Sequence, residues 1–177
     1  MIVLLSTSDT DLLSARASGA GYRLGNPARL TKDDVPALLD GADVVVVRIL
    51  GGRRAWEDGL DAVLASGVPS VVLGGEQAPD AELMELSTVA TGIVAEAHAY
   101  LAHGGPQNLL QLARFLSDAI ALTGEGFEPP APTPTWGILE RPAPLARADS
   151  RSVSEVESRT IKQAPVRGPL ETRDRRV

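Results

Sequence analysis

The chain of 177 residues contains no cysteine, and its only aromatic residues are two Trp, two Tyr and two Phe. Without thiols it has no disulfide framework, no thiolate metal site and no cysteine nucleophile. So few aromatic side chains argue against a stacking surface for single-stranded nucleic acid. The first apolar run, Ile2–Leu5, follows no basic region and is far too short for a signal peptide or a membrane span. We therefore expect a cytoplasmic protein without a membrane partner.

Positively charged residues are scarce in the first part of the chain. Residues 1–128 carry 8 Lys and Arg against 17 Asp and Glu, whereas residues 129–177 carry 9 against 6. An acidic domain of this kind has no electrostatic footprint for DNA or RNA, so we expect no nucleic-acid partner. It suits a partner with a basic surface instead.

Hydrophobic runs alternate with helical patterns along the first 125 residues. Short apolar runs predict parallel strands near residues 2–5, 43–48 and 70–73, with a shorter strand at 22–24. Helical spacing and capping residues predict helices between them, at about 9–17, 31–40, 53–65, 79–86, 92–102 and 106–122. This order is typical of an α/β fold in which helices flank a parallel sheet, and we expect a flavodoxin-like sandwich.

The composition changes after residue 128. We predict an α/β domain over residues 1–128, and a proline-rich, polyproline-like linker over 129–143. Residues 144–177 are rich in Arg, Ser, Glu and Pro and lack apolar periodicity, so we predict a disordered tail.

Arg48 is the most informative single residue, because it interrupts a valine-rich strand near its carboxyl end. Two interpretations are open: a buried Arg paired with an acidic loop residue, or an Arg that faces an anion or a partner. The neighbouring strand ends carry glycine pairs, and the candidate ligand-facing or partner-facing set is Arg48, Gly51, Gly52, Gly74, Gly75, Glu76 and Asp9. The glycines match no phosphate-binding motif, which favours a role in turns.

Acidic residues near the strand ends have a structural and a chemical interpretation. Ser8 or Asp9 fits the cap of the first helix and Asp11 fits its first turn, although the carboxylates of Asp9 and Asp11 can also serve acid–base or metal chemistry. Glu76 is a potential partner of Arg48. His98 and His103 lie five residues apart and so on different helix faces, which argues against a shared metal. We expect no catalytic and no metal-binding residue in this chain.

Several segments of the chain occur in the same order as similar segments in one protein family. They are Leu4–Leu13, Val45–Gly52, Leu73–Glu76 with Pro79–Leu83, and Tyr100–Asn108, followed by Pro129-Pro130 and Gly137. Together they resemble the amino-terminal region of the large subunit of aerobic cobaltochelatase, which is related to the large subunit of magnesium chelatase. The resemblance covers about residues 1–143 and ends where the segment rich in Arg, Ser, Glu and Pro begins. A truncated chain with an out-of-frame tail and a genuine short paralogue are both open.

The resemblance implies a function that the residues alone do not indicate. Such subunits bind a corrinoid precursor of vitamin B12 and insert cobalt with the use of ATP, together with an AAA+ ATPase subunit and a second small subunit. The resemblance carries no catalytic residue onto this chain, which we expect to hold no cofactor and to be inactive alone. A stand-alone α/β module that docks on a partner through its strand-end loops is the alternative.

Overall fold

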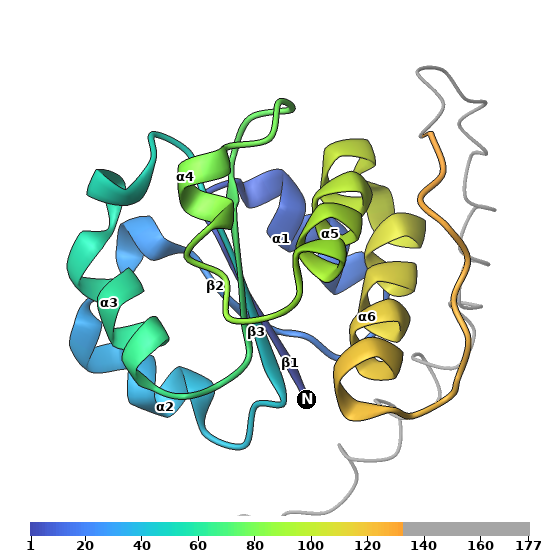
Figure 1. Cartoon of the computed structure of the whole chain (residues 1–177), viewed down its shortest axis with the longest axis horizontal. Helices are drawn as coiled ribbons and strands as arrows, with labels where there is room; N and C mark the ends of the chain where they lie inside the picture. The colour runs from blue at the N-terminus through green and yellow to red at the C-terminus, as the bar shows by residue number, and fades with distance from the viewer. Residues whose placement is uncertain (133–177) are drawn as a thin grey trace, which may run out of the picture. The chain divides into compact units, whose positions relative to one another are not determined.

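A computed structural model describes residues 1–132, which form a parallel four-stranded sheet between two layers of helices (Figure 1). The strands are β1 (Ile2–Ser6), β2 (Arg23–Gly25), β3 (Val44–Ile49) and β4 (Ser70–Gly74). Their order is β2-β1-β3-β4, with every neighbouring pair parallel. This order agrees with flavodoxin-like winding. The predicted fold class is confirmed, and the predicted tail lies outside the described residues.

The helices cover both faces of the sheet, as the buried, valine-rich strands predict. Figure 1 shows α1 (Asp9–Ala17), α5 (Thr91–His103) and α6 (Gly105–Ala121) on one face, and α2 (Val35–Leu39), α3 (Glu57–Ala65) and α4 (Ala81–Met84) on the other. Side chains of each strand alternate between two cores: Leu4 and Val46 face α1, α5 and α6, while Leu5 and Val47 face the opposite layer. None of the described helices is long and apolar enough to cross a membrane.

Two predicted helices differ from the structure. The segment expected to form one helix from Thr31 begins as a 3₁₀ turn, η2 (Lys32–Asp34), and continues as the short α2. The helix predicted over 53–65 is divided into η3 (Arg53–Ala55) and α3. Trp56 separates them, because its backbone is not helical and its indole N–H donates to the Leu30 carbonyl at 3.1 Å. A tertiary hydrogen bond has overridden the local helical pattern.

The outer edge of β4 is occupied by the chain that follows α4. The Ser70 N–H donates to Thr88 Oγ1 at 2.8 Å, and the Val72 N–H donates to Ser87 Oγ at 2.9 Å. The Thr88 N–H in turn donates to the Ser70 carbonyl at 2.9 Å. Backbone groups at a sheet edge need partners or water. Here two hydroxyl groups supply acceptors where a fifth strand would otherwise pair.

Candidate functional site at the carboxyl ends of the strands

Arg48 lies at the carboxyl end of β3, between β1 and β4, and its residue is only 7% exposed. All three guanidinium nitrogens donate to protein acceptors. Nη1 donates to both carboxylate oxygens of Asp11 at 3.0 Å and to the Leu101 carbonyl at 3.3 Å. Nε donates to the Gly74 carbonyl at 3.3 Å, and Nη2 donates to the Gly75 carbonyl at 3.0 Å. Arg48 therefore joins β3 to α1, α5 and the end of β4.

Asp11 is the carboxylate that compensates the buried charge of Arg48. It lies in the first turn of α1, is itself 7% exposed, and accepts a further hydrogen bond from Ser6 Oγ at 2.7 Å. Ser8 caps the helix by accepting from the Asp11 N–H, which confirms one of the two predicted caps. A buried charge requires such a partner. The interpretation of Arg48 as a paired, buried residue is thus the one that the geometry supports.

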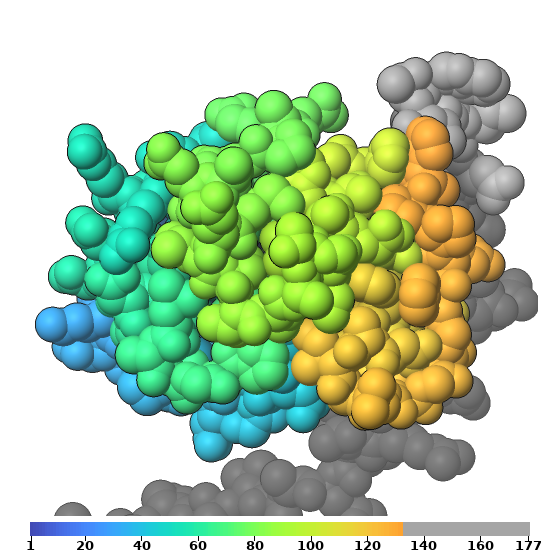
Figure 2. Space-filling view, viewed as in Figure 1, coloured from blue at the N-terminus to red at the C-terminus, as the bar shows by residue number. Residues whose placement is uncertain are grey.

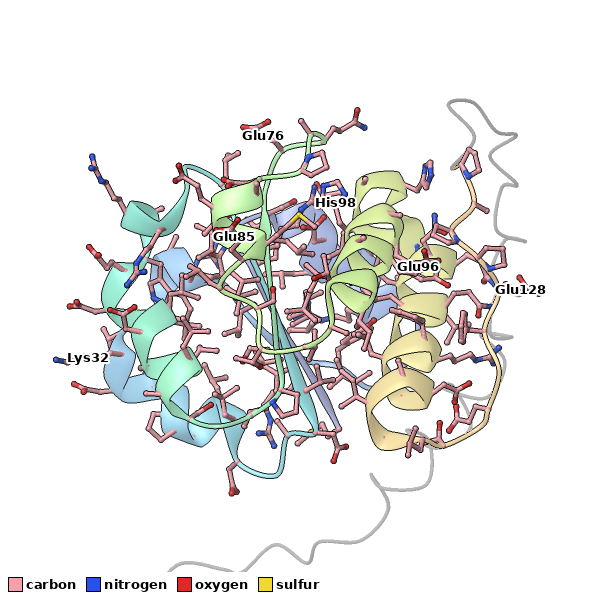
Figure 3. All side chains as sticks on the ribbon, viewed as in Figure 1. Lys32, Glu76, Glu85, Glu96, His98 and Glu128 are labelled. Carbon is pink, nitrogen blue, oxygen red and sulfur yellow. The ribbon has the colours of Figure 1, made fainter. Side chains whose placement is uncertain are left out.

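The suggested pairing of Arg48 with Glu76 is wrong. Glu76 follows β4 directly, but its side chain is exposed, and Figure 3 shows it at the outer end of the loop. Asp9 is also remote from the cluster: it is exposed and accepts from Asn26 Nδ2 at 3.0 Å and from Arg29 Nη2 at 3.5 Å. Spacing along the chain did not distinguish Asp9 from Asp11, because only the direction of the first helical turn decides which carboxylate faces inward.

The predicted glycine pairs serve turns and close backbone contacts. Gly51 and Gly52 both have positive φ angles, 89° and 75°, which favour glycine. A Cβ on Gly75 would lie 2.9 Å from the backbone of Leu50, so the loops after β3 and β4 approach each other too closely for a side chain. Gly74 is similarly limited by Asp80, whose Cβ would lie at 2.8 Å. These contacts support the turn interpretation of the glycines.

His98 is a buried residue that the sequence did not associate with Arg48. It lies on α5 with 8% exposure, and its Nε2 has no hydrogen-bond partner among the described residues. Figure 3 shows it below the loop that carries Glu76. Burial lowers the pKa of His98 below 6.5, the charge of Arg48 lowers it further, and a hydrogen bond with the Glu76 backbone opposes the shift. The imidazole is therefore neutral near pH 7.

The arrangement fills the place where flavodoxin-like proteins bind ligands. In such sheets the ligand crevice lies beyond the carboxyl ends of β1 and β3, where the winding reverses. Here Arg48 and Asp11 occupy that place, and Thr7 closes it further, accepting from the Leu50 N–H at 2.9 Å and donating its own N–H to the Arg48 carbonyl at 3.1 Å. A groove of about 530 Å³ lies elsewhere, beside Lys32, Trp56 and the start of α3.

Metal-binding chemistry has no geometric support in the part of the chain that the structure describes. No group of three or more His, Asp or Glu side chains is placed there to hold a metal ion. The geometry defines a class of protein: a flavodoxin-like α/β domain whose ligand crevice is closed by an internal ion pair.

The comparisons with known proteins identify a relative of this domain. No protein-family model matches the chain, and no curated protein does. Among solved structures, the catalytic subunit of cobaltochelatase from Mycobacterium tuberculosis matches with 59% sequence identity and a TM-score of 0.76. The match covers 80% of this chain, but this chain spans only 12% of the length of that subunit. Over the matched region the chain is similar to part of a cobaltochelatase catalytic subunit, which confirms the predicted resemblance.

Proposed function

We propose that this chain forms the amino-terminal α/β region of a cobaltochelatase large subunit and acts in cobalt insertion into a corrin precursor. The observation that carries the proposal is the 59% identity over 80% of the chain with a cobaltochelatase catalytic subunit. By family resemblance, the whole complex uses ATP and cobalt, works with an AAA+ ATPase subunit and a second small subunit, and acts in the cytoplasm.

Within such a subunit, the role of this domain is structural and not catalytic. A ligand site normally buries most of its ligand in a concave, largely apolar cavity. The crevice of this fold is instead filled by the ion pair between Arg48 and Asp11, which uses the cationic group that an anionic ligand would need. The tetrapyrrole and the reacting metal would then be held by parts of the large subunit outside this domain.

A chimeric large subunit tests this proposal. The matched segment of the M. tuberculosis subunit is replaced by the corresponding segment of this chain, and cobalt insertion is followed through the corrin absorption spectrum with ATP and both small subunits. We expect the chimera to insert cobalt and this chain alone to insert none. A second chimera carries an unrelated flavodoxin-like domain in the same place, and it tests whether the domain acts only as a spacer.

The outcomes separate the proposal from its alternative. Equal activity of both chimeras would show that the family-specific sequence of the domain is dispensable. If the first chimera is folded but inactive, and this chain alone binds a small subunit, then the domain is a stand-alone interaction module. Cobalt insertion by this chain alone would contradict the structural role.

A further inference from the structure

The chain reverses its direction after α6 and returns along the helices as an extended segment, residues 123–132, which we call the strap. Figure 2 shows it in orange, beside the yellow of α6. The reversal uses left-handed backbone at Leu122, with φ 54°, and at Gly124 and Gly126, with φ 70° and 77°. Residues 129–132, predicted to belong to a linker, are thus part of a segment bound to the domain.

Asp118 on α6 anchors the start of the strap. Its carboxylate accepts from Thr123 Oγ1 at 2.6 Å and from the N–H groups of Glu125 and Gly126, both at 2.8 Å. The hydrogen bond from the Thr123 hydroxyl is the main cause that lowers the pKa of Asp118, and the backbone N–H groups contribute. Since the contacts include two backbone groups, they fix the path of the chain.

Three buried side chains then contact the strap backbone at two residues. Gln111 Oε1 accepts from the Glu128 N–H at 2.9 Å, and the Tyr100 hydroxyl donates to the Glu128 carbonyl. Asn108 accepts from the Ala131 N–H at 3.0 Å and donates to the Ala131 carbonyl at 2.8 Å. Both backbone groups of both strap residues are therefore paired with side chains of α5 and α6.

The spacing of the two paired residues matches a polyproline II helix. That helix has about three residues per turn, so Glu128 and Ala131 lie on one side of it. Pro129 and Pro130 stand between them and have no N–H group that would need a partner. Figure 3 shows the side chain of Glu128 directed away from the helices, which agrees with recognition of its backbone alone.

The side chains that contact the strap backbone would be costly to bury if the strap did not pair with them. Tyr100 is fully buried, while Asn108 and Gln111 are 5% and 4% exposed. Buried amides and hydroxyls require hydrogen-bond partners, and within residues 1–132 these three side chains find most of theirs among the backbone groups of the strap. Phe127 packs edge-on against Phe115, with ring centroids 5.1 Å apart, and adds an apolar contact.

We propose that Tyr100, Asn108 and Gln111 form a docking site for extended peptides of the Xaa-Pro-Pro-Xaa type. The strap is its resident ligand, and another segment of this chemistry displaces it. The site recognises backbone groups one polyproline turn apart, which is why it needs no particular side chain at the two outer positions. Prolines lower the entropic cost of ordering such a ligand. The inference is independent of the proposed function in cobalt insertion.

The first test measures hydrogen exchange of the strap amides in the full chain. We expect the N–H groups of Glu128 and Ala131 to be protected. Asn108→Ala should accelerate exchange at Ala131 by about tenfold, the effect of losing one or two ordinary hydrogen bonds, and should affect Glu128 less. Gln107→Ala, an exposed neighbour on α6, is the matched control and should change neither. Unprotected Glu128 and Ala131 amides in the wild-type chain would overturn the proposal.

The second test supplies the ligand in trans. A fluorescent peptide with the sequence of residues 123–132 is added to a full-length variant whose own strap is weakened by Phe127→Ala, Pro129→Gly and Pro130→Gly. Exchange of the sheet amides confirms that this variant is folded. We expect a saturable rise in anisotropy with the variant, weaker binding to the wild-type chain, and about tenfold weaker binding after Asn108→Ala is added.

A permuted peptide, in which the order Glu-Pro-Pro-Ala is changed to Glu-Ala-Pro-Pro, tests the recognition of register. The last two residues of the permuted motif are prolines without N–H groups, so the position that Asn108 contacts no longer offers a donor. Binding of the permuted peptide at equal strength would overturn the proposal. So would the absence of saturable binding of the original peptide to the folded variant.

Discussion

Replacing Arg48 with Met removes the cation that pairs with the buried Asp11 carboxylate, which keeps the hydrogen bond from the Ser6 hydroxyl. It also removes the donor to three backbone carbonyl groups. Breaking a buried ion pair by removal of one partner typically costs about 3–5 kcal/mol. A domain of this size has a free energy of unfolding of about 5–15 kcal/mol. We therefore expect Arg48→Met to lose about 4 kcal/mol and to leave the domain only marginally folded.

The loss is measured by urea denaturation of the full chain, followed by far-ultraviolet circular dichroism. A double-mutant cycle with Asp11→Leu isolates the ion pair, and we expect a coupling energy of about 2–3 kcal/mol, because the double variant no longer buries an unpaired charge. The coupling should persist in 1 M salt, since buried pairs are screened less than exposed ones.

The control for the carbonyl contacts is Arg23→Met. Arg23 donates to the carbonyls of Leu38 and Asp40 at 2.8 and 2.7 Å, and no salt bridge joins it to a carboxylate within residues 1–132. Its replacement should cost about 1 kcal/mol. If Arg48→Met costs no more than this control, or if the coupling energy with Asp11 is near zero, then the closed crevice is not held by the ion pair.

Three further predictions concern single residues. Gly59→Ala should destabilise the domain by about 1–3 kcal/mol, because a Cβ at this position would lie 2.1 Å from the Trp56 ring. Gly92→Ala is the matched helical control: its Cβ would meet open space, so we expect it to stabilise the domain by up to about 1 kcal/mol in the same urea assay. Leu122→Gly should raise the free energy of unfolding by up to about 1 kcal/mol, since Leu122 is 83% exposed and its backbone is left-handed; an unchanged urea midpoint would refute this. The pKa of His98 is lowered in the folded state, so the free energy of unfolding should fall as the pH drops from 6.5 toward the folded-state pKa. His98→Gln should flatten this dependence, and wild-type and variant stabilities that change in parallel with pH would contradict it.

The sheet was predictable from the sequence because its signal is local. The run Val44–Val47 is buried on both faces, as four consecutive valines predict for a covered parallel strand. The cap at Ser8 was predictable for the same reason, since a cap depends on the three or four residues that follow it. The burial of Arg48 followed from its position in such a strand.

The partners of Arg48 were not predictable in the same way. They come from α1, α5 and the end of β4, so their choice depends on how the helices pack across the sheet. The burial of His98 has the same origin. The strap was missed because residues 129–132 have the composition of a linker, whereas their structure depends on Asn108, about twenty residues earlier. Side-chain recognition of an extended backbone leaves no periodic pattern in the recognised segment.

The hydroxyl groups of Ser87 and Thr88 on the β4 edge limit how this domain can be joined to others. At the opposite edge, β2 is only three residues long. A neighbouring sheet, from a second copy or from the remainder of a longer subunit, would have to displace residues 87–88 before it could pair with β4, and at β2 it would find only three residues to pair with. Assembly around this domain is therefore expected to use helix faces and loops, and the orientation of any neighbour is not dictated by strand direction.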